Sequence, residues 1–247
     1  FSPISPSRTT FVITGSGTMA MPQDADPPSN AQPSTADGAT TSTHPITRIA
    51  IVLFDGFDEL DAVGPFEVFK NAARSGAPVE VRLARLGGPG TVRASHGLQV
   101  HVDSGLDQGV DLVLVPGGGW NAPPGTHGAR AEVERGLLPS AIAKLHADGA
   151  TVASVCTGAM IVAASGLLEG RPATTHHEAL DDLAAAGASL VDARVVDTGD
   201  VLSAGGVTSG LDLALWLVER EWGEDLAAAV ASEIEHERVG PLWRGPG

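Results

Sequence analysis

Residues 151–160 have the sequence Thr151-Val-Ala-Ser-Val-Cys-Thr-Gly-Ala-Met160. The apolar run that ends at Val155 predicts a strand buried on both faces, and the small residues after Cys156 predict a helix that begins immediately. A sharp strand-to-helix turn of this kind presents its central side chain and leaves little room for bulky neighbours. The stretch therefore predicts an α/β fold with Cys156 at a nucleophile elbow.

Strands and helices alternate on both sides of this stretch. The predicted strands are 48–54, 79–86, 92–94, 98–102, 111–115, 151–155, 171–175, 190–196 and 201–204. The predicted helices are 58–75, 129–148, 157–165, 177–186, 207–221 and 224–238. Alternation with short connections indicates a doubly wound, mostly parallel sheet with helices on both faces. Sites in such sheets lie beyond the carboxyl ends of the strands, here after Phe54, Val115 and Val155.

Two segments of the chain differ in composition. Residues 1–45 are rich in Ser, Thr, Pro, Gly, Asp and Ala, which predicts disorder because little apolar surface is available for burial. Met19 and Met21 are both candidate native starts, so the residues before them are candidates for cloning additions. We expect residues 46–247 to form one catalytic domain.

Charge and cysteine content narrow the function classes. The formal net charge is −15, from 30 acidic and 15 basic residues, and such a surface repels nucleic-acid phosphates. No apolar run approaches the ~18–20 residues of a membrane helix, so we expect no membrane partner. We also expect a cytoplasmic location and a small-molecule substrate. Because Cys156 is the single cysteine, the chain has neither an internal disulfide nor a cysteine-rich zinc site.

The position of Cys156 predicts a reactive thiolate. The amino end of the following helix places N–H groups and partial positive charge near the sulfur, which should lower the pKa of the thiol. The alternative is a structural cysteine buried at the end of a strand. The turn and its small neighbours favour the reactive interpretation.

Asp61 is the candidate proton donor and acceptor. It follows the first strand, between Leu60 and Ala62, and a carboxyl in apolar company near a thiolate should have a raised pKa. The alternative is a helix cap, supplied by Asp61 itself or by Asp58 with Asp61 exposed. The helix is expected to bury a stripe formed by Leu60, Val63, Phe66, Val68 and Phe69.

The remaining polar candidates are a glycine loop and a histidine pair. Pro116-Gly-Gly-Gly119 lets backbone amides approach an anion closely, although such a run is also typical of a flexible loop. His176 is a candidate for the site, but adjacent histidines in a strand point to opposite faces, so we expect no metal shared with His177. The charged stretch 233–238 is expected to be a solvated helix face.

Six motifs together resemble the DJ-1/PfpI superfamily in order and spacing. They are Leu60-Asp-Ala-Val-Gly-Pro65, Pro116-Gly-Gly118, Ser154-Val-Cys-Thr-Gly158, Gly166-Leu-Leu-Glu-Gly-Arg171, Ala173-Thr-Thr-His176 and Ala204-Gly-Gly-Val-Thr-Ser-Gly-Leu-Asp212. The resemblance covers about residues 47–240 and implies a flavodoxin-like fold. Within the superfamily it points to the isocyanide hydratases and to the sensor domains of AraC-type regulators.

The resemblance implies a role for each matching residue. Cys156 would be the nucleophile and Asp61 the general acid and base. The amides of Gly118 and Thr157 would form an oxyanion-type pocket, with Gly117 and His176 also lining the substrate site. Isocyanides would become N-substituted formamides through a thioimidate, without a metal or organic cofactor. Members of the superfamily are commonly dimers, which implies a homodimer.

One residue departs from the peptidase members of the superfamily. Those relatives usually carry histidine directly after the cysteine, and this chain has Thr157, so a proteolytic triad is not expected. Two alternatives to the hydratase stay open. One is a glyoxalase or deglycase acting on 2-oxoaldehydes. The other is a non-catalytic redox or ligand sensor, although the sequence contains no recognisable helix-turn-helix portion up to Gly247.

Overall fold

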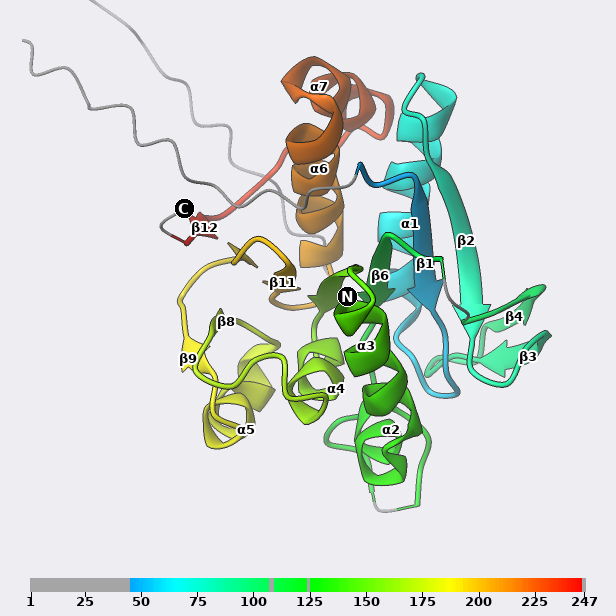
Figure 1. Ribbon diagram of the computed structural model, residues 1–247, viewed down its shortest axis with the longest axis vertical. Coiled ribbons are helices and arrows are strands. Elements are labelled where there is room, and N and C mark those ends of the chain that lie inside the picture. Colours follow the sequence, from blue (N-terminus) through cyan, green and yellow to red (C-terminus); the bar gives the residue numbers. More distant parts are fainter. Residues whose placement is uncertain (1–44, 107–108, 124, 246–247) are drawn as a thin grey trace, which may run out of the picture. The chain divides into compact units, whose positions relative to one another are not determined.

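A computed structural model describes residues 45–106, 109–123 and 125–245, and strands and helices alternate within these ranges (Figure 1). The strands are β1 (Arg48–Val52), β2 (Glu80–Arg85), β3 (Gly90–Arg93), β4 (Gln99–Val102), β5 (Ser104–Gly105), β6 (Leu112–Val115), β7 (Thr151–Val155), β8 (Pro172–Ala173), β9 (Ser189–Leu190), β10 (Val195–Asp197), β11 (Val201–Ala204) and β12 (Leu242–Arg244). The helices are α1 (Glu59–Arg74), α2 (Ala129–Arg135), α3 (Leu137–Ala147), α4 (Gly158–Ala164), the 3-10 helix η1 (His177–Ala179), α5 (Leu180–Ala185), α6 (Ser209–Trp222) and α7 (Glu224–Glu233). The segment predicted to be disordered, residues 1–45, lies outside the described ranges except for Pro45.

The main sheet has the strand order β12-β10-β11-β7-β6-β1-β2-β5. All neighbouring strands in it are parallel except β10 and β11. Helices α1, α6 and α7 pack together on one face, and α2, α3, α4 and α5 pack together on the other (Figure 1). The predicted doubly wound, mostly parallel sheet is confirmed. No helix within the described ranges is both long and apolar enough to cross a bilayer.

The central strands β1, β6 and β7 carry the apolar runs of the sequence. Strands β6 and β7 are buried along their whole length, and β1 is buried from Ile49 onward. Such strands are covered by helices on both faces, which is why they contain few alternating polar residues. Their carboxyl ends lie side by side and carry the loops that form the site.

Helix α1 buries only part of the predicted stripe, and Phe66 is partly buried against the core. Val68 and Phe69 are fully buried as expected, but Leu60 is 39% exposed and Val63 is 43% exposed. Gly64 and Pro65 lie against α6, where Gly64 faces Leu211 and Pro65 faces Gly210, so the two glycines let the helices approach closely. A Cβ atom on Gly64 would lie 3.3 Å from a side-chain carbon of Leu211 in α6.

The predicted helix over 129–148 is broken in two at Gly136. Gly136 has φ 72°, a left-handed conformation that glycine adopts without strain. Pro139 explains the break, because within one continuous helix its ring would clash with the carbonyl of Arg135. Helix α3 therefore restarts at Leu137, with Pro139 in its first turn, where no backbone N–H is needed.

The C-terminal region differs from expectation in three places. The predicted strand 190–196 is divided between β9, which pairs with β8, and β10, which joins the main sheet. Helix α7 ends at Glu233, and Glu235 has φ 50°, so the stretch 233–238 is not a continuous solvated helix face. His236 binds the buried carboxylate of Asp212 instead, at 3.0 Å. Strand β12, which pairs with β10, was not predicted.

Candidate active site

Cys156 lies in a strained turn between β7 and α4. Its φ of 55° is in the left-handed region, which residues other than glycine rarely adopt. Three hydrogen bonds to the backbone of Cys156 hold the turn. The Cys156 N–H donates to the carbonyls of Ala204 (3.1 Å) and Gly205 (2.8 Å), and the Thr175 hydroxyl donates to the Cys156 carbonyl (2.8 Å). The geometry is that of the predicted nucleophile elbow.

Gly158 explains why the residues after the cysteine are small. A Cβ atom at this position would lie 2.1 Å from the carbonyl oxygen of Val115, at the end of the neighbouring strand. The start of α4 therefore packs directly against the backbone of β6. A larger residue would push the elbow away from the loop that follows β6.

The three loops selected from the sequence meet at one edge of the sheet. The Asp58 N–H donates to the carbonyl of Gly117 at 2.8 Å, which joins the loops after β1 and β6. The Gly117 N–H donates to Asp61 Oδ2 at 2.8 Å. The Gly118 N–H donates to Thr157 Oγ1 at 2.9 Å, which joins the loops after β6 and β7. Residues far apart in the sequence thus form one hydrogen-bonded unit around Cys156.

Asp61 is fully buried in the first turn of α1. Asp58 caps the helix by accepting from the Leu60 N–H at 3.2 Å, so the capping role does not fall to Asp61. The sulfur of Cys156 is near enough to stabilise the charged form of the Asp61 carboxyl by hydrogen bonding. No described residue gives Asp61 Oδ1 a hydrogen bond of regular geometry, which leaves a buried acceptor beside the sulfur.

Burial raises the pKa of both members of this pair. The pKa of Asp61 rises to about 8, mainly because its carboxylate is desolvated. The pKa of Cys156 rises to about 12, through desolvation and then through the charge of Asp61. The expected low pKa of the thiol is therefore wrong, because burial and the neighbouring carboxylate outweigh the N–H groups at the start of α4.

The pair loses its protons as a unit. Near neutrality both groups hold a proton, and the first ionisation, near pH 8, leaves one negative charge on the pair. Because the pKa of Asp61 is the lower of the two, that charge lies mainly on its carboxylate, and the arrangement of carboxyl with thiolate is the minor one. In this minor arrangement the sulfur is the nucleophile, and Asp61 already carries the proton that the reaction needs.

Thr157 supplies hydrogen bonds to the sulfur. Its backbone N–H and its hydroxyl both lower the pKa of Cys156, so both stabilise negative charge on the sulfur. Its hydroxyl oxygen also accepts the Gly118 N–H. Thr157 therefore links the nucleophile to the glycine loop, and it is 6% exposed, as is Cys156.

The glycine loop positions the acid and the threonine. The Gly117 N–H donates to Asp61, and the Gly118 N–H donates to Thr157. Contrary to expectation, neither amide is therefore free to bind an anionic group of a substrate. A Cβ atom on Gly117 would lie 2.5 Å from both the backbone nitrogen and the hydroxyl oxygen of Thr157. Position 117 therefore requires glycine, because Thr157 lies too close to leave room for a side chain.

His176 lies beside the elbow without a bond to Cys156 in the described part of the chain. Its Nδ1 accepts from the Glu178 N–H at 3.3 Å, so it caps η1, and its ring lies 4.2 Å from that of His177. A Cβ atom on Gly206 would touch its Cδ2 at 3.4 Å, which places the ring at the loop after β11.

Two supporting residues were missed from the sequence. The Thr175 hydroxyl donates to the Cys156 carbonyl. The only feature of the sequence that pointed to this residue was its position next to His176. Glu59 holds the turn between β3 and β4, accepting from the Ser95 hydroxyl (3.1 Å) and from the backbone of His96 (2.8 Å). The hairpin is therefore anchored to the start of α1, two residues before Asp61.

One group in the described ranges has the composition of a metal site. Asp58, Glu59 and His96 bring three ligand atoms within 4.8 Å of one another. These residues already have partners, since Asp58 caps α1, and Glu59 binds the hairpin turn and the His96 ring at 2.7 Å. Their arrangement is accounted for without an ion.

The family of the chain follows from comparison with known proteins. Residues 47–220 match the family model described as the DJ-1/PfpI family, with Asp61, Cys156 and Thr157 inside the match. The chain is a DJ-1/PfpI family member. The family assignment made from the six sequence motifs is confirmed.

DJ-1/PfpI relatives of this chain include enzymes with different substrates. An isonitrile hydratase from Pseudomonas putida is 33% identical over 200 residues, which cover 80% of this chain and 82% of the relative. A deglycase from Thermococcus kodakarensis is 32% identical over 163 residues, 63% of this chain and 88% of the relative. The crystal structure of a ThiJ/PfpI family protein from Pseudomonas syringae aligns with TM-score 0.70 and 25% identity, covering 82% of this chain and 80% of the other.

Proposed function

We propose that this chain hydrates isocyanides, R–NC, to N-substituted formamides, R–NH–CHO. The observation that carries the proposal is the buried pair of Asp61 and Cys156, in which a carboxyl that is protonated near neutrality lies beside a sulfur nucleophile. The similarity to an isonitrile hydratase along 80% of the chain supports the substrate class. The steps below use side chains alone and need neither a metal ion nor an organic cofactor.

The first step adds the thiol across the terminal carbon of the isocyanide. The Cys156 sulfur forms a bond to this carbon, and the proton held by Asp61 moves to the same carbon. The product is a thioimidate, R–N=CH–S–Cys, and Asp61 is left as a carboxylate. The thiolate is the better nucleophile, and the N–H and hydroxyl of Thr157 stabilise it before attack.

The second step adds water to the thioimidate carbon. As the water oxygen bonds to carbon, Asp61 takes one proton from the water and passes it to the substrate nitrogen, giving R–NH–CH(OH)–S–Cys and leaving Asp61 as a carboxylate. The carbon–sulfur bond then breaks as the carbonyl forms. The hydroxyl proton returns to the Asp61–Cys156 pair, so the pair regains its starting protons and the formamide leaves.

The absence of a histidine after the nucleophile favours this chemistry over peptide hydrolysis. An amine leaving group must be protonated as it departs, and the Thr157 side chain is a poor general acid for that step. Addition to an isocyanide expels no leaving group in its first step. One carboxyl that first donates and then accepts a proton is sufficient.

A deglycase or glyoxalase activity is the second candidate. The deglycase from Thermococcus kodakarensis is nearly as similar to this chain, although over a shorter segment. A thiol and a carboxyl that share protons also suit addition to a 2-oxoaldehyde. The two reactions differ in substrate and product, so a direct comparison separates them.

The test is to incubate the protein with cyclohexyl isocyanide and, separately, with methylglyoxal. The proposal expects N-cyclohexylformamide from wild type and none above background from Cys156→Ala. Lactate as the main product would favour the second candidate. Inactivity toward both compounds, together with oxidation of Cys156 to sulfinic acid by mild peroxide, would favour a sensor.

A further inference from the structure

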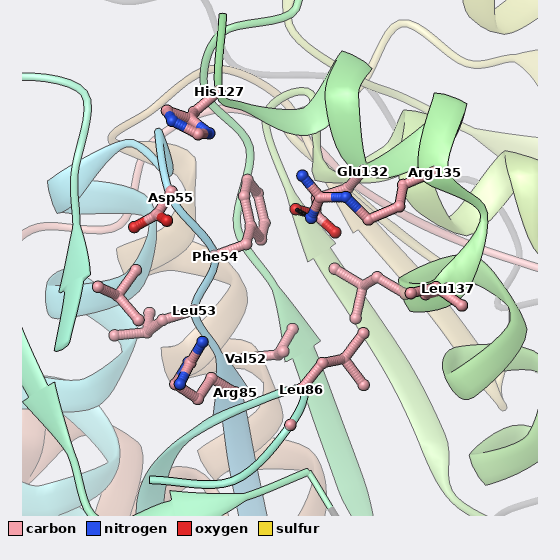
Figure 2. A pocket seen from close by; sticks show the side chains of 13 residues that line it. Val52, Leu53, Phe54, Asp55, Arg85, Leu86, His127, Glu132, Arg135 and Leu137 are labelled. Atoms are coloured by element: carbon pink, nitrogen blue, oxygen red, sulfur yellow. Dashed lines mark hydrogen bonds and ion pairs between the residues drawn. The ribbon is translucent and has the colours of Figure 1, made fainter. Parts of the chain in front are cut away.

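A cavity of about 310 Å³ lies where β1 and β2 end against α2 and α3 (Figure 2). Its lining includes Val52 at the end of β1, the next three residues up to Asp55, and the start of α3 at Leu137 and Leu138. Cys156, Asp61 and Thr157 are not part of this lining. The cavity is therefore distinct from the site proposed for isocyanide hydration.

The floor of the cavity is apolar. It is formed mainly by Val52, Leu53, Leu86, Val92 and Leu138. All of these except Leu86 are at least 98% buried, so the floor is a fixed part of the core. A surface of this kind favours a hydrocarbon or aromatic body, which would gain free energy by leaving water.

Two carboxylates lie at the polar side of the cavity. Glu132 is 4% exposed, and its Oε1 accepts from Arg135 at 2.6 Å. Asp55 Oδ1 accepts from the Arg93 N–H at 2.9 Å. Within the described ranges no hydrogen bond reaches the second oxygen of either carboxylate. Figure 2 shows the two groups on either side of the Phe54 ring.

The guanidinium groups of the lining are already engaged by the protein. Arg135 binds Glu132, and Arg85 Nη1 donates to the carbonyls of Gly88 and Pro89, both at 3.3 Å. Burial and the charge of Asp55 raise the pKa of Glu132, so a further negative charge would be unfavourable beside it. The net charge of −15 attracts cations to the whole molecule.

We propose that this cavity binds a small organic amine, with its apolar body on the floor and its ammonium group at the polar side, where Asp55 and Glu132 lie. An ammonium has three N–H donors, so two of them can bind the two unoccupied carboxylate oxygens. Hydrogen bonds between an ammonium and a carboxylate are stronger than those between neutral groups. A ligand carboxylate would instead have to displace Arg135 from Glu132.

The test is to titrate the protein with benzylamine at pH 7 and low salt by isothermal calorimetry. Benzyl alcohol and benzoate have nearly the same shape but differ in charge. Benzylamine is expected to bind at least about tenfold more tightly than either, since one charge-assisted hydrogen bond contributes roughly that factor. Equal or tighter binding of benzoate, or no binding of benzylamine, would overturn the proposal.

Substitutions test where benzylamine binds and whether its binding depends on the cysteine site. Glu132→Gln and Asp55→Asn should each weaken benzylamine binding about tenfold, and Asp55→Asn keeps an oxygen for the Arg93 N–H. Asp103→Asn removes the same charge from an exposed position and should leave the affinity unchanged. Cys156→Ala should also leave it unchanged, whatever the outcome of the isocyanide assay. Binding that survives both carboxylate substitutions, or that requires Cys156, would contradict the assignment.

Discussion

The carboxyl group of Asp61 and the sulfur of Cys156 share one buried environment, although they lie 95 positions apart in the printed sequence. The pKa of each group is raised, Asp61 to about 8 and Cys156 to about 12, so each holds its proton more tightly than in water. Their relationship determines both the reactivity and the pH dependence of the site.

The first prediction concerns pH. Because the pair loses its first proton near pH 8, kcat/KM for an isocyanide should rise about tenfold per pH unit below 8 and level off above it. The measurement is a rate profile from pH 6 to 10. A profile that is flat from pH 6 to 8 would show that the pair is already ionised at neutrality.

The second prediction concerns stability. A carboxyl whose pKa is raised on folding favours the native state fully below its unfolded pKa, near 3.8, and this advantage is lost as pH rises through 8. Above pH 8 the buried carboxylate destabilises the fold by on the order of 5 kcal/mol. Asp61→Asn should therefore be more stable than wild type in urea at pH 9, with a smaller difference at pH 5. A difference that is independent of pH would contradict the raised pKa.

The third prediction concerns the glycine loop. Gly117→Ala would place a methyl group 2.5 Å from Thr157, so the loop or the elbow must move. We expect a loss of about 1–3 kcal/mol in stability and at least a hundredfold loss in kcat/KM. Gly105→Ala is the control, since its Cβ atom would meet nothing nearer than 3.4 Å. Equal effects of the two substitutions would argue against a positioning role for Gly117.

The fourth prediction concerns the hydroxyl of Thr157. Thr157→Val keeps the shape but leaves the Gly118 N–H without its acceptor and the sulfur without one donor. The loss of hydrogen bonding to the thiolate should amount to about 1–3 kcal/mol. It should be seen as a tenfold or larger decrease in the rate at which iodoacetamide alkylates Cys156. Thr157→Ser should retain most of the wild-type rate. If serine and valine behave alike, the hydroxyl has no role.

The fifth prediction concerns the homodimer that the family resemblance implies. Leu60 and Val63 lie one turn apart on α1 and are 39% and 43% exposed, which suits a surface covered by a second copy. Val63→Glu should shift the molecular mass measured by light scattering from dimer to monomer. Ser75→Glu adds the same charge at the end of α1 and should have no effect. A wild-type protein that is monomeric at all concentrations would contradict the prediction.

Local sequence patterns predicted the fold well because the strands are strongly apolar and the connections are short. The meeting of the loops after Phe54, Val115 and Val155 followed from the rule for parallel sheets, and the structure confirms it. The split of the helix at Gly136 was missed because the effect of Pro139 depends on its register in the helix.

The electrostatics of the site were predicted less well. The sequence shows a cysteine before a helix, which lowers a thiol pKa, but it does not show that Asp61 and Cys156 are buried together. Similarly, the glycine amides were expected to face a substrate, and they bind Asp61 and Thr157 instead. Burial and partner choice depend on tertiary contacts, which periodicity and motifs do not reveal.

The most direct test of the Asp61–Cys156 pair is a thiolate titration by absorbance at 240 nm. The chain contains one cysteine and no tyrosine, so the signal reports on Cys156 with little background. We expect the Cys156 thiol of wild type to ionise only partly near pH 8 and to be incompletely ionised at pH 10, whereas the thiol of Asp61→Asn should complete its ionisation at lower pH. A single full transition near the ordinary thiol pKa of about 8.5, unchanged by Asp61→Asn, would contradict the coupling.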